Sequence, residues 1–555
     1  MKRLLYIVIM LSLVALQGCE KKPVPAPAGS LTITGERALV RLNCHQGDEA
    51  TITFTAKCDW RISTSGEGFA VSPSSGAGSE EPQSITIRTT VDNSGAAPMH
   101  RGSATIVLKD YPATKHTVKV VQCAPSERTY IVYMFGTSLS YYLNNNVKCI
   151  AEALNEDILG NDRLLVFIQN SRTKGVVKEI YHDKKRGEAV TDIVREIALP
   201  TTLTDSGFAE HLAMMMDIAP AERYAMIVGG HSSAWLPAAP VSEGTPLSMG
   251  VGYTPNWQPA PGGEVTRTIG EHNMRLQIDE FASALTLTGQ HFDWIYFDVC
   301  FMSSLEAAYA LRSNTDYIVG SPCEIMGYGS PYEVMLDELV KDDLDGASRE
   351  YHNFYTNDYY GSKSGCLSTI VCAELDALAS TVKALNANAV ANSFDIAEVQ
   401  PFEGREAHVF FDAESYMVQA HEEQSLVESF VEQLNKTVIN RYRTEKFYST
   451  YNARMNEIFY YSGVNMTPDE ACVALLDEQL ATMNTDIEAK RVEREHLKTE
   501  LEGAGLAPES SERYNALTAQ ISELTKQITK LQNQSKELKH YNPSLKETAW
   551  YKATH

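Results

Sequence analysis

One short stretch around Cys300 constrains the fold of this chain more than any other. Residues 294–297, Trp-Ile-Tyr-Phe, are apolar and lack Gly and Pro, which predicts a strand buried on both faces. From Leu305 onward, apolar residues recur at helical spacing, with Ser303 and Ser304 as candidate N-caps. Cys300 is therefore predicted at the turn from a strand into a helix, where a helix N-terminus would favour its thiolate.

A second stretch has the same pattern and favours a catalytic role for Cys300. Residues 224–228 are an apolar run that ends in Gly229 and Gly230, and His231 follows. The glycines permit backbone conformations closed to other residues and leave room for a substrate. A cysteine and a histidine at two strand ends can meet in space, as Cys–His chemistry requires. The alternatives are a buried core cysteine and a hydrogen-bonded loop histidine.

The two stretches resemble the clostripain family of cysteine peptidases, relatives of caspases, legumains and gingipains. Family members carry His-Gly-Ser-Gly-Trp after one strand and Asp-Ala-Cys-Leu-Met-Ser-Ser-x-Glu after another. This chain has His-Ser-Ser-Ala-Trp at 231–235 and Asp-Val-Cys-Phe-Met-Ser-Ser-Leu-Glu at 298–306. The resemblance is good over residues 129–376 and implies a caspase-like α/β domain, with helices on both faces of a mainly parallel sheet. Ser232 and Ala234 depart from the family, where glycines are usual.

The resemblance implies an endopeptidase with a dyad of Cys300 and His231. The thiolate would attack the scissile carbonyl, and the histidine would protonate the leaving amine. The backbone amides of Cys300 and Ser232 would bind the oxyanion. In the family, the residue at the position of Asp298 lines an S1 pocket for Arg or Lys, and a buried carboxylate suits a guanidinium. Glu324 is a second candidate for this pocket, and a turn or helix-cap role is the alternative for Asp298.

Self-processing is a further expectation, because family members are often cut after a basic residue between the two catalytic residues. Residues 236–264 contain several Pro and Gly and no apolar periodicity, which predicts an exposed loop. Arg267 and Arg275 are the basic residues between His231 and Cys300, and Arg267, just beyond a Pro-Gly-Gly turn, is the first choice. The alternative is a fixed lid on an enzyme that is active uncut.

The N-terminus has the pattern of a bacterial lipoprotein signal. Lys2 and Arg3 precede an apolar run, and Leu-Gln-Gly-Cys at 16–19 resembles a lipobox with Cys19 as the lipidation site. Residues 1–19 are therefore predicted to be a signal peptide and 20–30 a linker. The protein is expected in the cell envelope, held in the outer membrane by its lipid and facing the periplasm or the surface. An ordinary signal peptide with an incidental cysteine is the alternative.

Residues 31–124 have an all-β pattern. Alternating segments at 51–55, 84–88 and 104–108 are separated by turn residues, which predicts an immunoglobulin-like β-sandwich. Trp60 and Arg101, among others, resemble a BACON domain, a module common in Bacteroidetes proteins whose family name implies carbohydrate binding. A spacer is the favoured role and glycan binding the alternative.

From residue 128 to 400, strands alternate with helices, which indicates a largely parallel sheet. The strands are predicted at 130–135, 164–168, 317–320 and 368–372, with an edge hairpin near 176–181. The helices are predicted at 146–154, 208–216, 278–287 and 375–389. Residues 401–468 are assigned to the C-terminal part of the peptidase module, with a late strand at 456–461.

Two heptad patterns follow, at 476–501 and 514–538, joined by a Gly- and Pro-containing turn. They predict an antiparallel coiled-coil hairpin over residues 469–540, before a C-terminal segment at 541–555. Two roles remain open for the hairpin. It is either an arm for a partner or for self-association, or a structural spine.

Composition agrees with a multidomain, soluble enzyme. The chain has 555 residues, more than one domain requires, and a formal charge of −23 argues against nucleic acid as a partner. Protein or peptide substrates are expected. The sequence has no CxxC, HExxH or phosphate-loop motif, so no cofactor is expected; calcium is possible but not indicated by the sequence. The alternative function, motivated by Ser232 and Ala234, is a catalytically decayed surface lipoprotein that binds protein or glycan.

Overall fold

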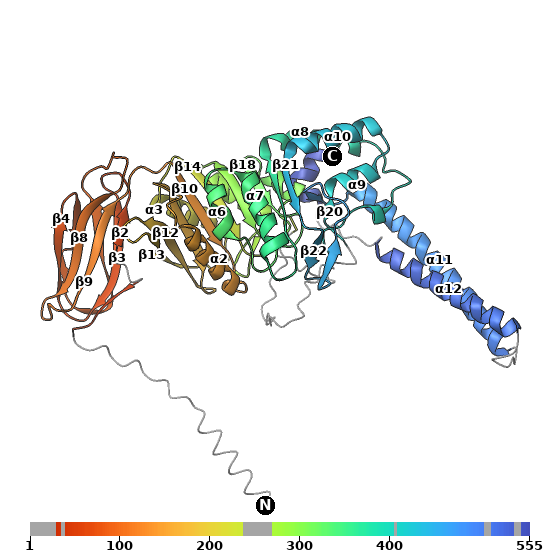
Figure 1. Cartoon of the computed structure of the whole chain (residues 1–555), viewed down its shortest axis with the longest axis horizontal. Helices are drawn as coiled ribbons and strands as arrows, with labels where there is room; N and C mark the ends of the chain where they lie inside the picture. The colour runs from red at the N-terminus through yellow and green to blue at the C-terminus, as the bar shows by residue number, and fades with distance from the viewer. Residues whose placement is uncertain (1–28, 35–38, 237–268, 404–407, 504–511, 538–544) are drawn as a thin grey trace, which may run out of the picture. The chain divides into compact units, whose positions relative to one another are not determined.

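The structure is a computed structural model that describes residues 29–34, 39–236, 269–403, 408–503, 512–537 and 545–555 (Figure 1). These residues form two compact units that divide after Pro125. The predicted signal peptide with Cys19 and nearly all of the predicted linker lie outside the described residues. Within the described parts, no helix is both long and apolar enough to cross a membrane.

The first unit consists of two sheets whose apolar faces share one core. The segments predicted at 51–55, 84–88 and 104–108 lie in three of its strands. Trp60 is 1% exposed and its ring lies edge-on to Phe54 at 5.0 Å between centroids, so it is a core residue. One sheet has the order β1 (Leu31–Ile33), β3 (Glu49–Ala56), β7 (Ser79–Thr89), β5 (Phe69–Ser72). The other has the order β2 (Leu39–Leu42), β9 (Lys115–Gln122), β8 (Met99–Leu108), β4 (Trp60–Gly66), β6 (Ser75–Gly76).

The second unit is built on a nine-stranded sheet (Figure 1). Its central strands are parallel and its edges antiparallel, because β12 and β13 form a hairpin at one edge and β19 and β21 close the other. Strands β10 and β11 are buried along their whole length, as their apolar runs predict. The order is β13 (Glu188–Ala198), β12 (Lys174–Asp183), β11 (Arg163–Gln169), β10 (Arg128–Met134), β14 (Arg223–Gly229), β17 (Phe292–Asp298), β18 (Thr315–Gly320), β19 (Cys366–Val371), β21 (Val438–Arg443).

Helices cover both faces of this sheet, and each face has its own apolar cluster. One face carries α2 (Ser140–Ala153), α6 (Tyr332–Val340) and α7 (Leu344–Asn353). The other carries α3 (Asp205–Ile218), α4 (Ile278–Leu287), α5 (Leu305–Leu311), α8 (Leu375–Asn386), α9 (Ala413–Ala420) and α10 (Gln424–Thr437). The sheet is therefore a buried layer whose strand ends are free to carry a site.

Several predicted bounds need correction. Helix α4 has the predicted bounds, but α2 begins at Ser140, before the predicted residue 146, and α8 ends at Asn386 rather than 389. The strand predicted at 456–461 is wrong beyond its second residue. Strand β23 (Arg454–Glu457) pairs with β22 (Lys446–Ser449) and ends there, because the amides of Phe459 and Tyr460 donate to the side-chain oxygen of Gln400 rather than to a strand.

Two long helices, α11 (Glu470–Gly503) and α12 (Glu512–Glu537), lie side by side where the hairpin was predicted (Figure 1). Lys490 Nζ of α11 donates to Gln527 Oε1 of α12 at 3.3 Å. The described heptad residues of both helices are buried or partly buried, while most of their neighbours are exposed. The buried ones are Leu476, Ile487, Leu517, Leu524 and Ile528. The last heptad residue, Leu538, lies outside the described residues.

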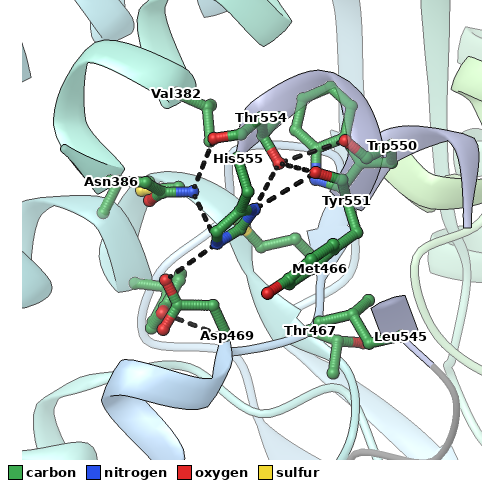
Figure 2. A pocket seen from close by; sticks show the side chains of 12 residues that line it. Val382, Asn386, Met466, Thr467, Asp469, Leu545, Trp550, Tyr551, Thr554 and His555 are labelled. Atoms are coloured by element: carbon green, nitrogen blue, oxygen red, sulfur yellow. Dashed lines mark hydrogen bonds and ion pairs between the residues drawn. The ribbon is translucent and has the colours of Figure 1, made fainter. Parts of the chain in front are cut away.

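The chain then returns to the second unit. Helix α13 (Ala549–Thr554) packs against α5 and α8, and Trp550 is buried at 5.5 Å from the ring of Tyr309. The terminal His555 stacks on Tyr551 and its Nε2 lies 3.4 Å from Asp469 Oδ2 (Figure 2). The cavity among these residues measures about 10 Å³, enough for about one water molecule. The C-terminal segment is thus part of the core around the helix that follows Cys300.

Candidate active site

The structure brings the two predicted catalytic residues to the carboxyl ends of two neighbouring central strands. Strands β14 and β17 are parallel neighbours, with Gly229 opposite Asp298. Beyond them, the Gly230 amide donates to the Asp298 carbonyl at 3.4 Å. His231 and Cys300 each follow this paired level by two residues, at the carboxyl ends of adjacent strands, where α/β sheets form their sites.

The turn that carries His231 needs the glycine before it. Gly230 has φ 147°, and a Cβ there would lie 2.7 Å from the carbonyl oxygen of Phe135. Three residues after the histidine, Ala234 has φ 51°, a left-handed conformation that favours glycine. The amide of Ala234 donates to Ser232 Oγ at 2.9 Å. Ala234 therefore adopts a backbone conformation that glycine reaches more easily than alanine.

The turn that carries Cys300 is held by backbone contacts. Phe301, directly after it, has φ 64°, and its amide donates to the Cys323 carbonyl at 3.1 Å. The Ser303 amide donates to the Ser321 carbonyl at 3.0 Å. A non-glycine residue in the left-handed region is strained and persists only where its surroundings fix it.

The expected influence of a helix N-terminus on Cys300 is not supported. Helix α5 begins at Leu305, and its N-cap is Ser304, whose Oγ accepts from the Ala307 amide at 3.4 Å. The other candidate cap, Ser303, bonds to the hydroxyl of Ser368 instead. Cys300 therefore lies four residues before the cap, and the helix dipole acts mainly within the first turn.

Cys300 differs from the other cysteines of the second unit in its exposure. It is half-exposed, and its Sγ accepts from the Ile325 amide at 3.4 Å. The others, Cys149, Cys323, Cys366, Cys372 and Cys472, are buried. Burial raises the pKa of the Cys149 and Cys372 thiols to about 12. Those thiols are neither accessible nor ready to ionise, so Cys300 is the cysteine of this unit suited to attack a substrate.

Asp298 is buried at the end of β17, 6% exposed. Its Oδ2 accepts from the Ser330 amide at 3.1 Å and from the Tyr332 hydroxyl at 2.9 Å. Its Oδ1 has no hydrogen-bond partner among the described residues. Burial raises the pKa of this carboxyl group. A buried oxygen without a donor can receive one from a ligand, and a cation beside it would favour the charged form.

Glu324 has a different environment from Asp298. It receives hydrogen bonds from the Ser449 hydroxyl at 2.5 Å and from the amide and hydroxyl of Thr450, the amide at 3.1 Å to either oxygen. These contacts fix the end of β22 to the loop after β18. The structure thus ties Glu324, in the loop after β18, to the end of β22.

Two residues not predicted from the sequence lie beside His231. Ser138 Oγ is 3.0 Å from His231 Nε2, and Glu271 Oε2 is 3.9 Å from the same nitrogen. Ser138 follows β10, the neighbour of β14, so the rule that sites form at strand ends could have indicated it. Glu271 belongs to the short strand β15 (Ile269–Glu271), which no pattern in the sequence indicated.

Comparison with known proteins fits this geometry. The sequence model of the clostripain family matches residues 132–550. The chain is a member of the clostripain family of cysteine peptidases. It is therefore a hydrolase, as are the C11 cysteine proteases that it resembles in structure. A search among curated proteins found no match.

Solved structures similar to this clostripain-family peptidase share its fold. A secreted C11 cysteine protease from Bacteroides thetaiotaomicron, called iotapain, is 27% identical with a TM-score of 0.55, covering 62% of this chain and 94% of that one. A secreted C11 protease from the same species, solved with an irreversible peptide inhibitor, is 22% identical with a TM-score of 0.52, covering 62% and 93%. An inactive C11 zymogen from Parabacteroides distasonis is 24% identical with a TM-score of 0.52, covering 64% and 96%.

The two processing candidates differ in what the structure says of them. Arg267 lies outside the described residues. Arg275 lies in β16 (Met274–Leu276), which pairs with β15, and the next residue, Leu276, is fully buried. A protease needs an accessible, extended segment, so cleavage after Arg275 would require the β15–β16 hairpin to open.

Proposed function

We propose that this clostripain-family peptidase is an endopeptidase with Cys300 as nucleophile and His231 as general acid and base. The observation that carries the proposal is the register of β14 and β17, which sets the two residues at equal distances beyond paired strand ends. The partial exposure of Cys300, while the other cysteines of the second unit are buried, supports it. Peptide substrates follow from the family's chemistry.

The mechanism has two stages. The Cys300 thiolate attacks the scissile carbonyl, and His231 protonates the leaving amine to give an acyl-enzyme. His231 then takes a proton from water, which attacks the acyl group and frees the thiol. The backbone amides of Cys300 and Ser232 are the proposed donors to the oxyanion. Ser232 retains such an amide although its position usually holds glycine.

We propose that Asp298 selects Arg or Lys before the scissile bond. Its buried Oδ1, which lacks a donor from the described residues, is placed to accept from a guanidinium or ammonium group. Because the carboxylate is taken out of water, an unpaired charge there is costly and a substrate cation would relieve that cost. Glu324 stays a second candidate, although Ser449 and Thr450 already donate to its oxygens.

Hydrolysis of fluorogenic peptides ending in Arg, Lys or a neutral residue tests both proposals. Cys300→Ala and His231→Ala should lose turnover while keeping the melting temperature, and Cys149→Ala, a buried cysteine, serves as the control. Asp298→Asn should lower kcat/KM on the Arg and Lys peptides relative to the neutral peptide, by a factor that corresponds to roughly 2–5 kcal/mol. Glu324→Gln should keep the wild-type preference for Arg and Lys. Absence of turnover in the wild type would instead favour the decayed, binding lipoprotein, and turnover that survives Cys300→Ala would refute the role of Cys300.

We further propose self-processing, a role for each accessory segment and a lipid anchor. Self-processing after Arg267 would give a new N-terminus at Thr268, absent in Cys300→Ala, which a mass measurement of the incubated protein would detect. Arg275 is the second choice because its neighbour Leu276 is buried. Residues 31–124 are proposed to be an immunoglobulin-like, BACON-type spacer, and residues 469–540 a coiled-coil hairpin. Lipid on Cys19 would hold the protein in the cell envelope.

A further inference from the structure

A carboxylate and a hydroxyl form a connected pair beside His231. Glu271 is held there by the chain, since the Gly270 amide donates to the His231 carbonyl at 2.9 Å. Its side chain is 9% exposed. Its Oε1 accepts from the Ser138 amide at 2.7 Å and from the Thr137 amide, and its Oε2 accepts from the Ser138 hydroxyl. The same hydroxyl oxygen lies 3.0 Å from His231 Nε2, so it bridges the carboxylate and the ring.

The positions of the protons between Glu271, Ser138 and His231 follow from which of these groups can donate a hydrogen bond and which can only accept one. Burial acts to raise the pKa of Glu271, but hydrogen bonds from Ser138 and the nearby His231 and His272 hold it below its ordinary value. The ionised carboxylate can only accept, so the single proton of the Ser138 hydroxyl goes to Glu271. The Ser138 oxygen can then only accept from His231, whose Nε2 must carry a proton. In the neutral ring, Nδ1 is therefore the basic nitrogen.

We propose that Ser138 and Glu271 are a positioning pair for His231. Ser138 holds the ring in the tautomer whose Nδ1 takes the proton of the Cys300 thiol. The charge of Glu271, 3.9 Å from Nε2, stabilises the imidazolium that results. The step moves one proton from sulfur to Nδ1 and leaves a thiolate and an imidazolium, and that proton later goes to the leaving amine. The inference rests on the proposed roles of His231 and Cys300.

A purely structural role is the competing explanation, because Glu271 also fixes the loop after β10 through two backbone amides. Glu271→Gln separates the two roles. The glutamine oxygen can still accept from both amides, so the loop is kept. Its amide nitrogen donates to Ser138, which turns the Ser138 proton toward His231 Nε2 and favours the tautomer protonated on Nδ1. The variant also removes the negative charge.

The experiment compares the full chain with Glu271→Gln, with Ser138→Ala and with Glu196→Gln. Glu196 is exposed on the edge strand β13 and controls for the loss of one charge. We would measure kcat/KM against pH on an Arg peptide, and the rate at which iodoacetamide alkylates Cys300 against pH. Glu271→Gln should lower kcat/KM about 100-fold or more, because it selects the wrong tautomer. It should also raise the pH at which Cys300 becomes reactive by about one pH unit or more.

The other variants complete the test. Ser138→Ala should cause a smaller loss and a smaller displacement of the alkylation profile, since it removes the bridge but leaves the charge. Glu196→Gln should match the wild type. Unchanged turnover and alkylation profiles in Glu271→Gln and Ser138→Ala, with Cys300→Ala inactive, would overturn the positioning pair and leave the dyad intact. Turnover by Cys300→Ala would mean that the proposed function itself fails. Should Glu271→Gln not fold, Ser138→Ala decides alone.

Discussion

At the residue scale, Glu306 is a buried carboxyl group that the proposed mechanism does not use. It is 1% exposed, and burial raises its pKa to about 7. Its Oε1 accepts from the Thr467 amide at 2.7 Å and its Oε2 from the Ser304 hydroxyl at 2.6 Å. The folded protein thus binds a proton here more tightly than the unfolded chain does. The stability that this proton contributes is complete below about pH 4.5 and is lost as the pH rises through 7.

We expect Glu306→Gln to remove this pH dependence. The amide can accept from Thr467 and donate to Ser304, so it mimics the protonated acid. The variant should be more stable than the wild type at pH 8, by up to roughly 3 kcal/mol, because a tenfold difference in proton affinity between the folded and unfolded states is worth about 1.4 kcal/mol. Melting temperatures at pH 5 and pH 8 test this. Glu398→Gln, on the surface, is the control, and a variant that is no more stable at pH 8 would refute the account.

The residues of the proposed dyad could be predicted, and a strand end could have indicated Ser138, but its contact with Glu271 could not be predicted. His231 and Cys300 each follow an apolar strand within a motif, and both signals are local. Glu271 reaches Ser138 across 133 positions of sequence, and the pair becomes visible only when the sheet places β10 beside β14. Ala234 shows the reverse case. Its departure from glycine suggested decay, yet its backbone keeps the left-handed conformation.

At the element scale, a segment just before the hairpin is attached to the turn that carries Cys300. The Asn465 amide donates to the Ser303 carbonyl at 2.8 Å, and its Nδ2 donates to the Pro322 carbonyl at 2.7 Å and the Phe301 carbonyl at 3.4 Å. Asn465 is fully buried in β24 (Asn465–Met466). The segment that leads into α11 is thereby fixed to the residues that follow Cys300 and to the loop after β18.

We expect Asn465→Ala to reduce turnover more than its loss of stability explains. The substitution leaves buried carbonyls without donors, at a cost of roughly 1–3 kcal/mol each, next to the strained Phe301. Asn314→Ala is a matched control, because Asn314 is also buried and donates to Thr286 Oγ1 at 2.8 Å. Both variants should have a lower melting temperature than the wild type. At a temperature well below melting, kcat should fall in Asn465→Ala alone. Equal kcat values would contradict this.

The central strands and α4 could be predicted because a long apolar run or a clear helical period specifies each of them. The helices α6, α7, α9 and α10 were not predicted. Helices α6, α7 and α9 are short, and they are helical because they pack on the sheet or on one another. Helix α10 has 14 residues, and its apolar residues at 426, 427, 430, 431 and 434 recur at helical spacing, so this pattern could have indicated it. Residues 465–467 contact residues near Cys300 that are far away in the sequence. The Thr467 amide, for example, donates to Glu306, 161 positions earlier. No local pattern encodes a contact of that range.

The hairpin offers another prediction at this scale. At the start of α11, Cys472 and Leu476 belong to the core of the second unit. Farther along the two helices, Lys490 of α11 donates to Gln527 of α12. Replacing residues 491–526 with a short Gly-Ser turn should therefore leave kcat/KM on a short peptide and the melting temperature near their wild-type values. Sedimentation of both forms distinguishes the two open roles. An arm for self-association predicts a loss of dimer, and a structural spine predicts a loss of stability or activity.

At the scale of the whole molecule, the two units have separate cores. The apolar cluster of the first unit contains residues 40–120, and the two clusters around the nine-stranded sheet contain residues from Tyr130 onward. The division falls after Pro125. No residue is shared between these clusters, and domains with their own cores fold as units. The peptidase should therefore not need the first unit to fold.

We expect residues 126–555 alone to fold and to cleave an Arg or Lys peptide at the rate of the full chain. This version also lacks Cys19, so it should be found in the soluble fraction, whereas the full chain should sediment with membranes. Full-length Cys19→Ala separates the two effects, because it keeps the first unit and loses only the lipid. It should be soluble and fully active. A Cys19→Ala protein that still sediments after high-salt washing would place the anchor elsewhere. Residues 126–555 that aggregate, or that cleave far more slowly than soluble Cys19→Ala, would show that the first unit supports the catalytic one.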